Sequence, residues 1–134
     1  MGIFKTTKLL YGNPELIPTI ASAIEREFGS DGYDVCVDNL RDGGKEVSIT
    51  KGGLFKRVLG MRTALKIRLT PWKGKIWFKT EVGLFGNQVI PTIIVLSGWS
   101  IILVPQIWGL IRQSKLDDKA LAIAERIIYE SDVK

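Results

Sequence analysis

The sequence contains no histidine and only one cysteine, Cys36, among its 134 residues. These two absences exclude a Ser-His-Asp or Cys-His nucleophile and any His or multi-Cys zinc site within the chain. A single thiol also cannot form an internal disulfide. Glycine-rich stretches lack both the spacing and the Lys-Ser/Thr ending of a phosphate-binding loop. We therefore predict no catalytic residues, no bound metal and no cofactor, and favour a non-catalytic protein.

Acidic residues are absent from positions 47–80, in a chain whose formal net charge is +5. The stretch before it carries a net charge of −3 and the stretch after it a net charge of −1, so the whole positive excess lies in the middle. A charge block of this kind makes a local electric field that attracts anions. Its basic residues are Lys51, Lys56, Arg57, Arg62, Lys66, Arg68, Lys73, Lys75 and Lys79.

Charge of either sign is absent from the thirty residues 82–111, which begin just after Glu81. An uncharged apolar run of 18 or more residues predicts a transmembrane helix, because about 20 helical residues cross the hydrocarbon. Prolines at 91 and 105 and a Ser-Gly break at 97–98 leave two alternatives open. One is a hairpin that enters a single leaflet, and the other is a buried core segment. The expected membrane anchors are Ile93, Ile94, Trp99, Ile101, Ile102 and Trp108.

Residues 1–81 are predicted to form an α+β domain. Apolar residues at helical spacing predict a helix that starts between Asn13 and Ile17 and ends at Gly29 or Gly32. Alternating polarity predicts four strands, at 33–40, 46–51, 63–70 and 75–82, joined as two hairpins. The expected fold is thus one helix on a four-stranded antiparallel sheet.

Residues 112–134 resume a helical pattern after the apolar segment 82–111. The stretch from Ser114 to Asp117 resembles a capping box, which predicts that the helix begins there. The apolar positions of this helix share one face, so it needs a partner surface. We expect it to pack back on the sheet. The apolar positions are Leu116, Ala120, Leu121, Ala124, Ile127 and Ile128.

The basic block is the candidate functional feature. Basic side chains next to a membrane segment attract anionic headgroups, and aromatic residues among them also suit single-stranded nucleic acid. A third interpretation is the excess of positive charge typical of cytoplasmic flanks, without a specific ligand. The residues expected to contact lipid or a partner are Lys56, Arg57, Arg62, Lys66, Arg68, Trp72, Lys73, Lys75, Trp77 and Lys79.

Together these patterns predict a small membrane-associated protein with its basic domain in the cytoplasm. It would act as an anchor or accessory subunit, and its basic face would meet anionic lipid or a larger membrane complex. The alternative is a soluble basic module that binds nucleic acid or another polyanion. In that case residues 82–111 form a core or the interface of a homo-oligomer.

Overall fold

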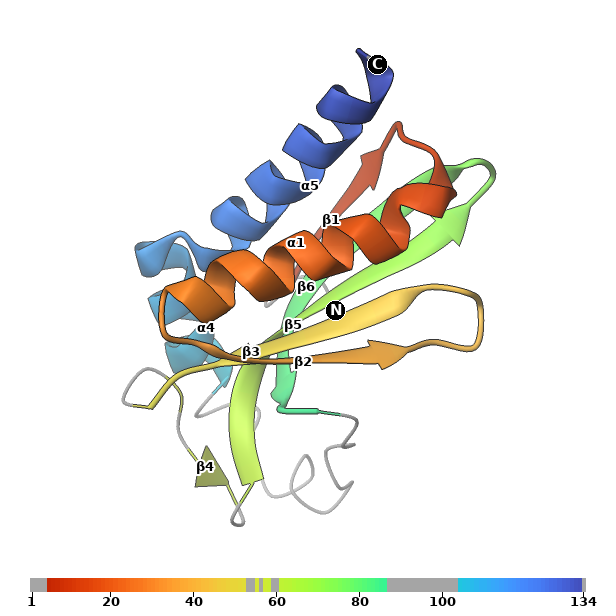
Figure 1. Cartoon of the computed structure of the whole chain (residues 1–134). Coiled ribbons are helices and arrows are strands. Elements are labelled where there is room, and N and C mark those ends of the chain that lie inside the picture. The colour runs from red at the N-terminus through yellow and green to blue at the C-terminus, as the bar shows by residue number, and fades with distance from the viewer. Residues whose placement is uncertain (1–4, 53–54, 56, 59–60, 87–103, 134) are drawn as a thin grey trace.

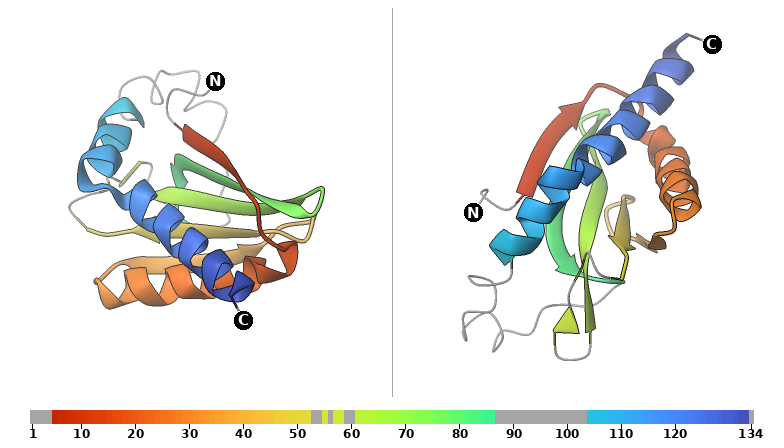
Figure 2. Two further views of the ribbon diagram at one scale, coloured as in Figure 1. Left: turned by 90° about the horizontal axis from the view of Figure 1, so that it is seen from above. Right: turned by 90° about the vertical axis from the view of Figure 1, so that its left-hand side faces the viewer.

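An antiparallel sheet forms one layer of the protein, and helices cover one of its two faces (Figures 1 and 2). The computed structural model describes residues 5–52, 55, 57–58, 61–86 and 104–133. Within them the sheet has the strand order β1-β6-β5-β3-β2, and a short sixth strand, β4, pairs with β5. The described elements are β1 (Lys5–Leu10), the 3-10 turn η1 (Pro14–Leu16), α1 (Ile17–Ser30), β2 (Asp34–Asn39), β3 (Lys45–Thr50), β4 (Arg57–Val58), β5 (Met61–Trp72), β6 (Lys75–Leu84), α4 (Val104–Ser114) and α5 (Leu116–Asp132).

Both predicted hairpins are confirmed, and each has a turn that its residues explain. In the β2–β3 turn the Asp42 carboxylate accepts a hydrogen bond of 2.9 Å from the backbone N–H of Gly44. The β5–β6 turn has positive φ at both central residues, 49° at Lys73 and 76° at Gly74. Two consecutive positive φ values define the tight hairpin turn whose twist matches that of the strands.

The prediction of four strands is wrong, because the main path of the sheet has a fifth strand, β1, at its edge. β1 pairs antiparallel with β6, with Thr7 opposite Lys79 and Leu10 opposite Ile76. β1 has only six residues, and its partner strand lies about seventy positions further along the chain. Local periodicity in so short a segment gave no sign of this distant pairing.

The predicted helix and its buried face are confirmed in α1. Ile17, Ile20, Ile24 and Phe28 are buried against the inward side chains of the sheet. Asn13 accepts a hydrogen bond from the backbone N–H of Glu15 and so caps η1, the turn that leads into α1. The same core contains the alternating strand residues Val47, Ile49, Leu65, Ile67, Leu69, Ile76 and Phe78.

The C-terminal helix α5 lies beside α1, on the same face of the sheet (Figures 1 and 2). Leu116, Ala120 and Ala124 are buried in the common core, as the apolar stripe predicted. Ion pairs join α5 to its neighbours: Lys119 pairs with Asp31, Arg126 with Glu27 and Lys8 with Glu125.

The predicted capping box at the start of α5 is wrong. Lys115 occupies the N-cap position with a left-handed backbone, φ 58°, and makes no side-chain capping hydrogen bond. Asp117 is buried and forms an ion pair with Arg112 of α4 instead. A sharp left-handed turn at Lys115 therefore joins α4 to α5.

The apolar segment 82–111 is not one continuous element. Its first residues, 82–84, end β6, and its last residues, 104–111, belong to α4. Ile107 and Ile111 lie one helical turn apart on α4 and are buried in the protein core. In the described part of the chain, no helix is long and apolar enough to cross a membrane. The break expected at 97–98 lies outside the described residues.

Candidate binding surface

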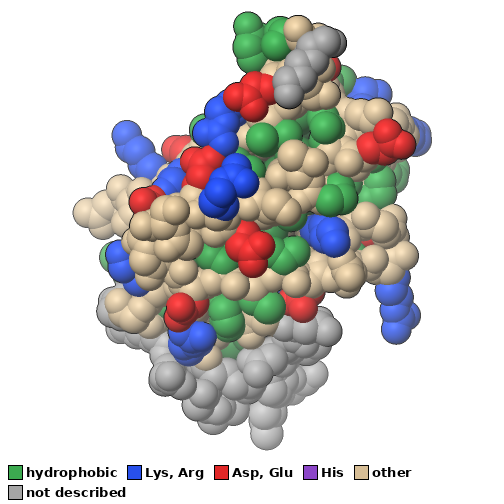
Figure 3. Space-filling view, in the orientation of Figure 1, with side chains coloured by type: hydrophobic (Ala, Val, Ile, Leu, Met, Phe, Trp, Pro, Cys, Tyr) green, Lys and Arg blue, Asp and Glu red, His purple; other side chains and the backbone are tan. Residues whose placement is uncertain are grey.

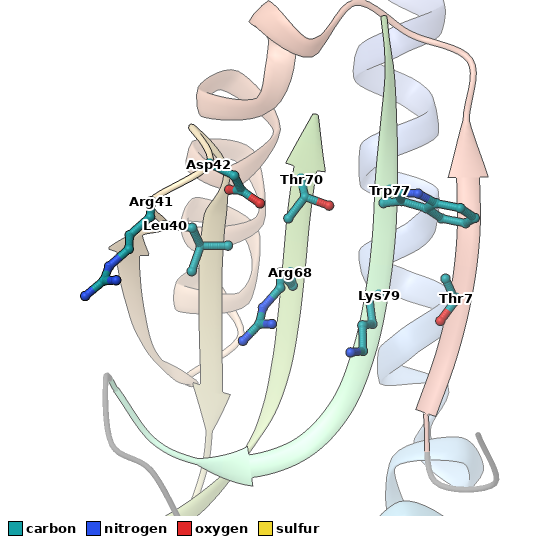
Figure 4. Close-up of a pocket in the computed structure, with 8 residues that line it drawn as sticks. All are labelled: Thr7, Leu40, Arg41, Asp42, Arg68, Thr70, Trp77 and Lys79. Carbon is teal, nitrogen blue, oxygen red and sulfur yellow. The ribbon is translucent and has the colours of Figure 1, made fainter. Parts of the chain in front are cut away.

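The open face of the sheet, opposite the helices, carries rows of polar side chains that follow the strand register (Figure 4). One row crosses all five long strands, through Thr7, Lys79, Arg68, Glu46 and Asp38. Two cations on β6 and β5 are thus followed by two carboxylates on β3 and β2. The open face is therefore polarised, with its positive half on β5 and β6.

A buried ion-pair cluster lies at the boundary between the two halves. The Glu46 carboxylate receives Lys66 Nζ at 3.0 Å on one oxygen and Arg68 Nη2 at 2.8 Å on the other. Lys66 Nζ also donates to the carbonyls of Leu84, at 2.8 Å, and Gly86. Only 8% of the Lys66 side chain is exposed. We predicted Lys66 as a binding residue on the outward face, but the structure shows that it joins the end of β6 to β3 and β5.

The charge state of Glu46 follows from the same contacts. Burial raises the pKa of its carboxyl, but hydrogen bonds and charge from Arg68 and Lys66 outweigh burial and leave the pKa below its ordinary value. Glu46 is therefore ionised at neutral pH. It holds the Arg68 guanidinium in place from one side.

An open groove of about 500 Å³ lies on the positive half of the open face (Figure 4). Figure 4 shows the Arg68 and Lys79 side chains extending in the same direction from adjacent strands, with Thr7 beside Lys79. Trp77 reaches from β6 toward β1, and Leu40 bounds the groove on the β3 side. Its lining residues are Thr7, Leu40, Arg41, Asp42, Arg68, Thr70, Trp77 and Lys79. We name it the Arg68–Lys79 groove.

The cations of the Arg68–Lys79 groove are only partly neutralised. Among the described residues, Lys79 has one ionic contact, at 3.9 Å from Glu81. Arg68 keeps 41% of its side chain exposed although it pairs with Glu46. Positive charge in the groove therefore remains available to a ligand.

A second cluster lies at the tip of the β5–β6 hairpin. Trp72 and Trp77 pack with their ring centroids 6.4 Å apart. Lys73 Nζ lies 5.2 Å from the centre of the Trp72 ring, and Lys75 Nζ lies 5.6 Å from that of Tyr11. Tyr11 is 73% exposed and Trp72 46% exposed. We call these five residues the aromatic tip.

The aromatic tip lies at one end of β6, and the chain leaves the sheet toward the rest of the apolar segment at the other end. β6 runs over ten residues from Lys75, at the tip, to Leu84. A strand of this length spans about 30 Å. Sequence proximity had placed the basic residues beside residues 82–111, but the strand carries Lys73 and Lys75 away from Gly86, at which that segment leaves the sheet.

Other predicted contact residues do not join either cluster. Arg62 pairs with Asp34 at 2.6 Å, and its guanidinium lies over the Phe85 ring. Arg57 lies in β4 opposite Arg62, and Lys56 lies outside the described residues.

The predicted membrane anchors divide in the same way. Trp108 of α4 is half-buried and packs against the core, which is a structural role inside the protein. The other expected anchors, Ile93, Ile94, Trp99, Ile101 and Ile102, lie outside the described residues.

Cys36 shares the open face with Asp34 and Asp38, as the alternation predicted. Burial, followed by the negative charge of Asp38, raises the pKa of the Cys36 thiol. The thiol therefore stays protonated and unreactive at neutral pH. Its weak 3.7 Å hydrogen bond to Asp38 suits this neutral state.

Sequence reasoning missed several residues of the two clusters. Thr7 and Tyr11 were missed because β1 was not predicted, so nothing placed them next to β6. Thr70 and Leu40 were predicted as parts of strands but not as groove residues. Extending the alternation from Arg68 to Thr70 would have placed Thr70 on the same face.

Comparison with known proteins adds little to this geometry. No protein-family model matches the chain, and no curated protein matches it. Three chains of known structure match. One of them, titled "Crystal structure of Ara h 8.0201", is 10% identical, with a TM-score of 0.29 over 89% of this chain and 97% of that chain. A TM-score this low does not establish a common fold.

Proposed function

We propose that this protein is a non-catalytic, peripheral membrane-docking protein that binds anionic lipid surfaces through its aromatic tip. The observation that carries this proposal is the exposure of Tyr11 and Trp72 next to Lys73 and Lys75, at one end of the molecule. Tyrosine and tryptophan rings prefer the headgroup level of a bilayer, where an apolar body and a polar edge are both accommodated.

Charge supports the same proposal. Each lysine near an anionic bilayer contributes about 1 kcal/mol of attraction. On the helix side of the molecule, in contrast, acidic and basic side chains are interspersed (Figure 3). Docking would therefore favour the end that carries the aromatic tip. The cytoplasmic leaflet is the anionic one in cells, so we place the protein there, as an anchor or accessory subunit for a partner at the membrane.

Vesicle sedimentation tests the proposal. The protein should pellet with phosphatidylcholine vesicles that contain phosphatidylserine, and less so with phosphatidylcholine alone. The Lys73→Gln/Lys75→Gln variant should bind about 30-fold more weakly, because two contributions of about 1 kcal/mol are lost. Trp72→Ala should weaken binding to both kinds of vesicle.

A charge-matched control makes the test specific to the tip. Lys51→Gln/Lys119→Gln removes the same net charge from side chains near the C-terminal end of α1, where Lys51 lies over Tyr33 and Lys119 over Phe28. This variant should bind vesicles nearly as well as the unmodified protein. Equal losses in the two double variants would refute docking through the tip.

The alternative function, binding of single-stranded nucleic acid, rests on the paired rings of Trp72 and Trp77 beside lysines. Bases stack on such rings, and the binding weakens steeply with salt. A labelled single-stranded oligonucleotide that binds when vesicles do not, at the same salt concentration, would favour this alternative over membrane docking.

A further inference from the structure

We propose that the Arg68–Lys79 groove is a binding site for a phosphomonoester group. The inference rests on the proposed function in so far as a membrane lipid carries that group. The chemistry of the groove itself applies equally to a soluble phosphomonoester.

The first argument is the placement of two like charges directly opposite each other. Arg68 of β5 and Lys79 of β6 are register partners in an antiparallel pair. The Cβ atoms of such partners are about 5 Å apart, and like charges in these positions destabilise the sheet. An anion between the two side chains would replace this repulsion with two attractions. A bound anion would therefore reduce the repulsion between the Arg68 and Lys79 side chains.

The second argument is the convergence of hydrogen-bond donors. Thr7 is the register partner of Lys79 on its other side, and Thr70 lies two residues beyond Arg68 on the same strand face. Both threonines line the groove with Arg68 and Lys79 (Figure 4). Within the described residues, neither threonine hydroxyl has a hydrogen-bond partner in the protein. Two cationic and two hydroxyl side chains thus line one open volume together, while Figure 4 shows Arg41, which also lines the groove, extending away from them.

The third argument identifies the class of anion. A phosphomonoester carries a charge of about −1.5 to −2 at pH 7 and three strong acceptor oxygens. Two cations and two hydroxyls match that charge and number of acceptors, whereas a carboxylate offers one charge and two oxygens. An arginine guanidinium also matches the oxygen geometry of phosphate.

The acidic neighbours of the groove limit where the anion lies. Glu46 is already bonded to Arg68 and Lys66, and Asp42 accepts a hydrogen bond from the Gly44 backbone. Their negative charges keep an anion on the β5–β6 side. Trp77 continues the groove to Trp72 and the aromatic tip. A phosphomonoester on a lipid at the tip would thus lie within reach of the groove.

Two ligands test the site in solution and at a membrane. Glycerol 3-phosphate, a phosphomonoester, should cause saturable shifts of the Trp77 indole resonance, and dimethyl phosphate, a diester, should not. Vesicles with phosphatidic acid, a monoester, should bind more tightly than vesicles with phosphatidylglycerol, a diester, at equal surface charge. Lys79→Gln and Thr7→Val should each reduce glycerol 3-phosphate affinity, about tenfold for Lys79→Gln because one charged contact is lost.

The control variant is Lys75→Gln, which removes one charge from the aromatic tip and leaves the groove intact. It should weaken vesicle binding but keep the affinity for glycerol 3-phosphate. Circular dichroism melting of every variant checks that the fold is retained.

The outcomes separate the two proposals. Glycerol 3-phosphate binding without vesicle binding supports the groove as a site for a soluble phosphomonoester and refutes membrane docking. Vesicle binding with no preference for phosphatidic acid, and no binding of glycerol 3-phosphate, overturns the groove proposal and leaves membrane docking standing. Binding of monoester and diester with equal affinity also overturns it.

Discussion

Replacing Lys66 with methionine should destabilise the protein more than any comparable change at its surface. The Lys66 ammonium donates to three acceptors: the buried Glu46 carboxylate, the buried Leu84 carbonyl and the partly buried Gly86 carbonyl. Methionine retains most of the aliphatic stem, which passes over Gly83, but supplies no donor. The change therefore isolates the loss of the ammonium group.

The expected cost of Lys66→Met is about 3–5 kcal/mol, the usual range when one partner of a buried ion pair is removed. The lower end of that range applies, because Arg68 still holds the second Glu46 oxygen at 2.8 Å. A domain of this size is stable by about 5–15 kcal/mol, so the variant should still fold.

Guanidinium unfolding, followed by circular dichroism, measures this cost. The matched control is Lys8→Met, because Lys8 pairs with Glu125 at 2.9 Å but both side chains are about half exposed. That surface pair should contribute less than about 1 kcal/mol. Amide hydrogen exchange should also become faster at Phe85. This residue lies between Leu84 and Gly86, whose carbonyls Lys66 binds, and its own N–H donates to the Arg62 carbonyl.

A second variant separates the lost ammonium from other effects. In Lys66→Met/Glu46→Leu the buried carboxylate is removed as well, so the double variant should be less destabilised than the sum of the two single changes, by about 1–3 kcal/mol. If Lys66→Met and Lys8→Met cost the same, the Lys66 cluster does not stabilise the sheet as argued.

Two further predictions follow from the same face of the sheet. Because the pKa of Glu46 is lowered by folding, its contribution to stability is complete above its ordinary value of 4.5 and disappears as pH falls through the folded-state pKa below it. Unfolding measured at several acidic pH values should show a shallower slope in Glu46→Gln, and an unchanged slope would contradict this assignment. Gly44→Ala should destabilise by about 1–3 kcal/mol, since a Cβ there would lie 2.3 Å from the Leu69 carbonyl oxygen. The control Gly29→Ala in α1 meets nothing within 4 Å and should stabilise by about 0.5–1 kcal/mol in the same assay, and a reversed order of the two would refute the packing argument.

Local sequence patterns predicted those parts of the fold that local patterns determine. The spacing of Ile17, Ile20 and Phe28 predicted α1 and its buried face, and turn residues predicted both hairpins. β1 was not predicted, because its stability comes from pairing with β6, a strand far away in the chain. The separate helix α4 was not predicted, because the uncharged composition of 82–111 favoured one continuous apolar segment over a strand end followed by a core helix.

The candidate site shows the same division. Alternation correctly placed Lys66, Arg68 and Lys79 on one face of the sheet. It could not predict that Lys66 would be buried, because that burial depends on the Leu84 and Gly86 carbonyls at the end of a neighbouring strand. Strand alternation predicts which face a side chain occupies, but not what covers it.

Residues 47–80 include no acidic residue, but acidic residues from other parts of the chain lie beside them in the folded protein. Strands β5 and β6 carry most of the basic block, yet pairing brings Glu46 of β3 next to Lys66 and Arg68, and Asp34 of β2 next to Arg62. These carboxylates neutralise the half of the block nearer the start of β5. No carboxylate from β2 or β3 reaches the other half, where the aromatic tip and Lys79 lie, within the described residues. The sheet thus divides the basic block into one structural cluster and one end suited to anions. The aromatic tip and Lys79 lie at that end, and Arg68, which keeps 41% of its side chain exposed beside Glu46, lies between the two.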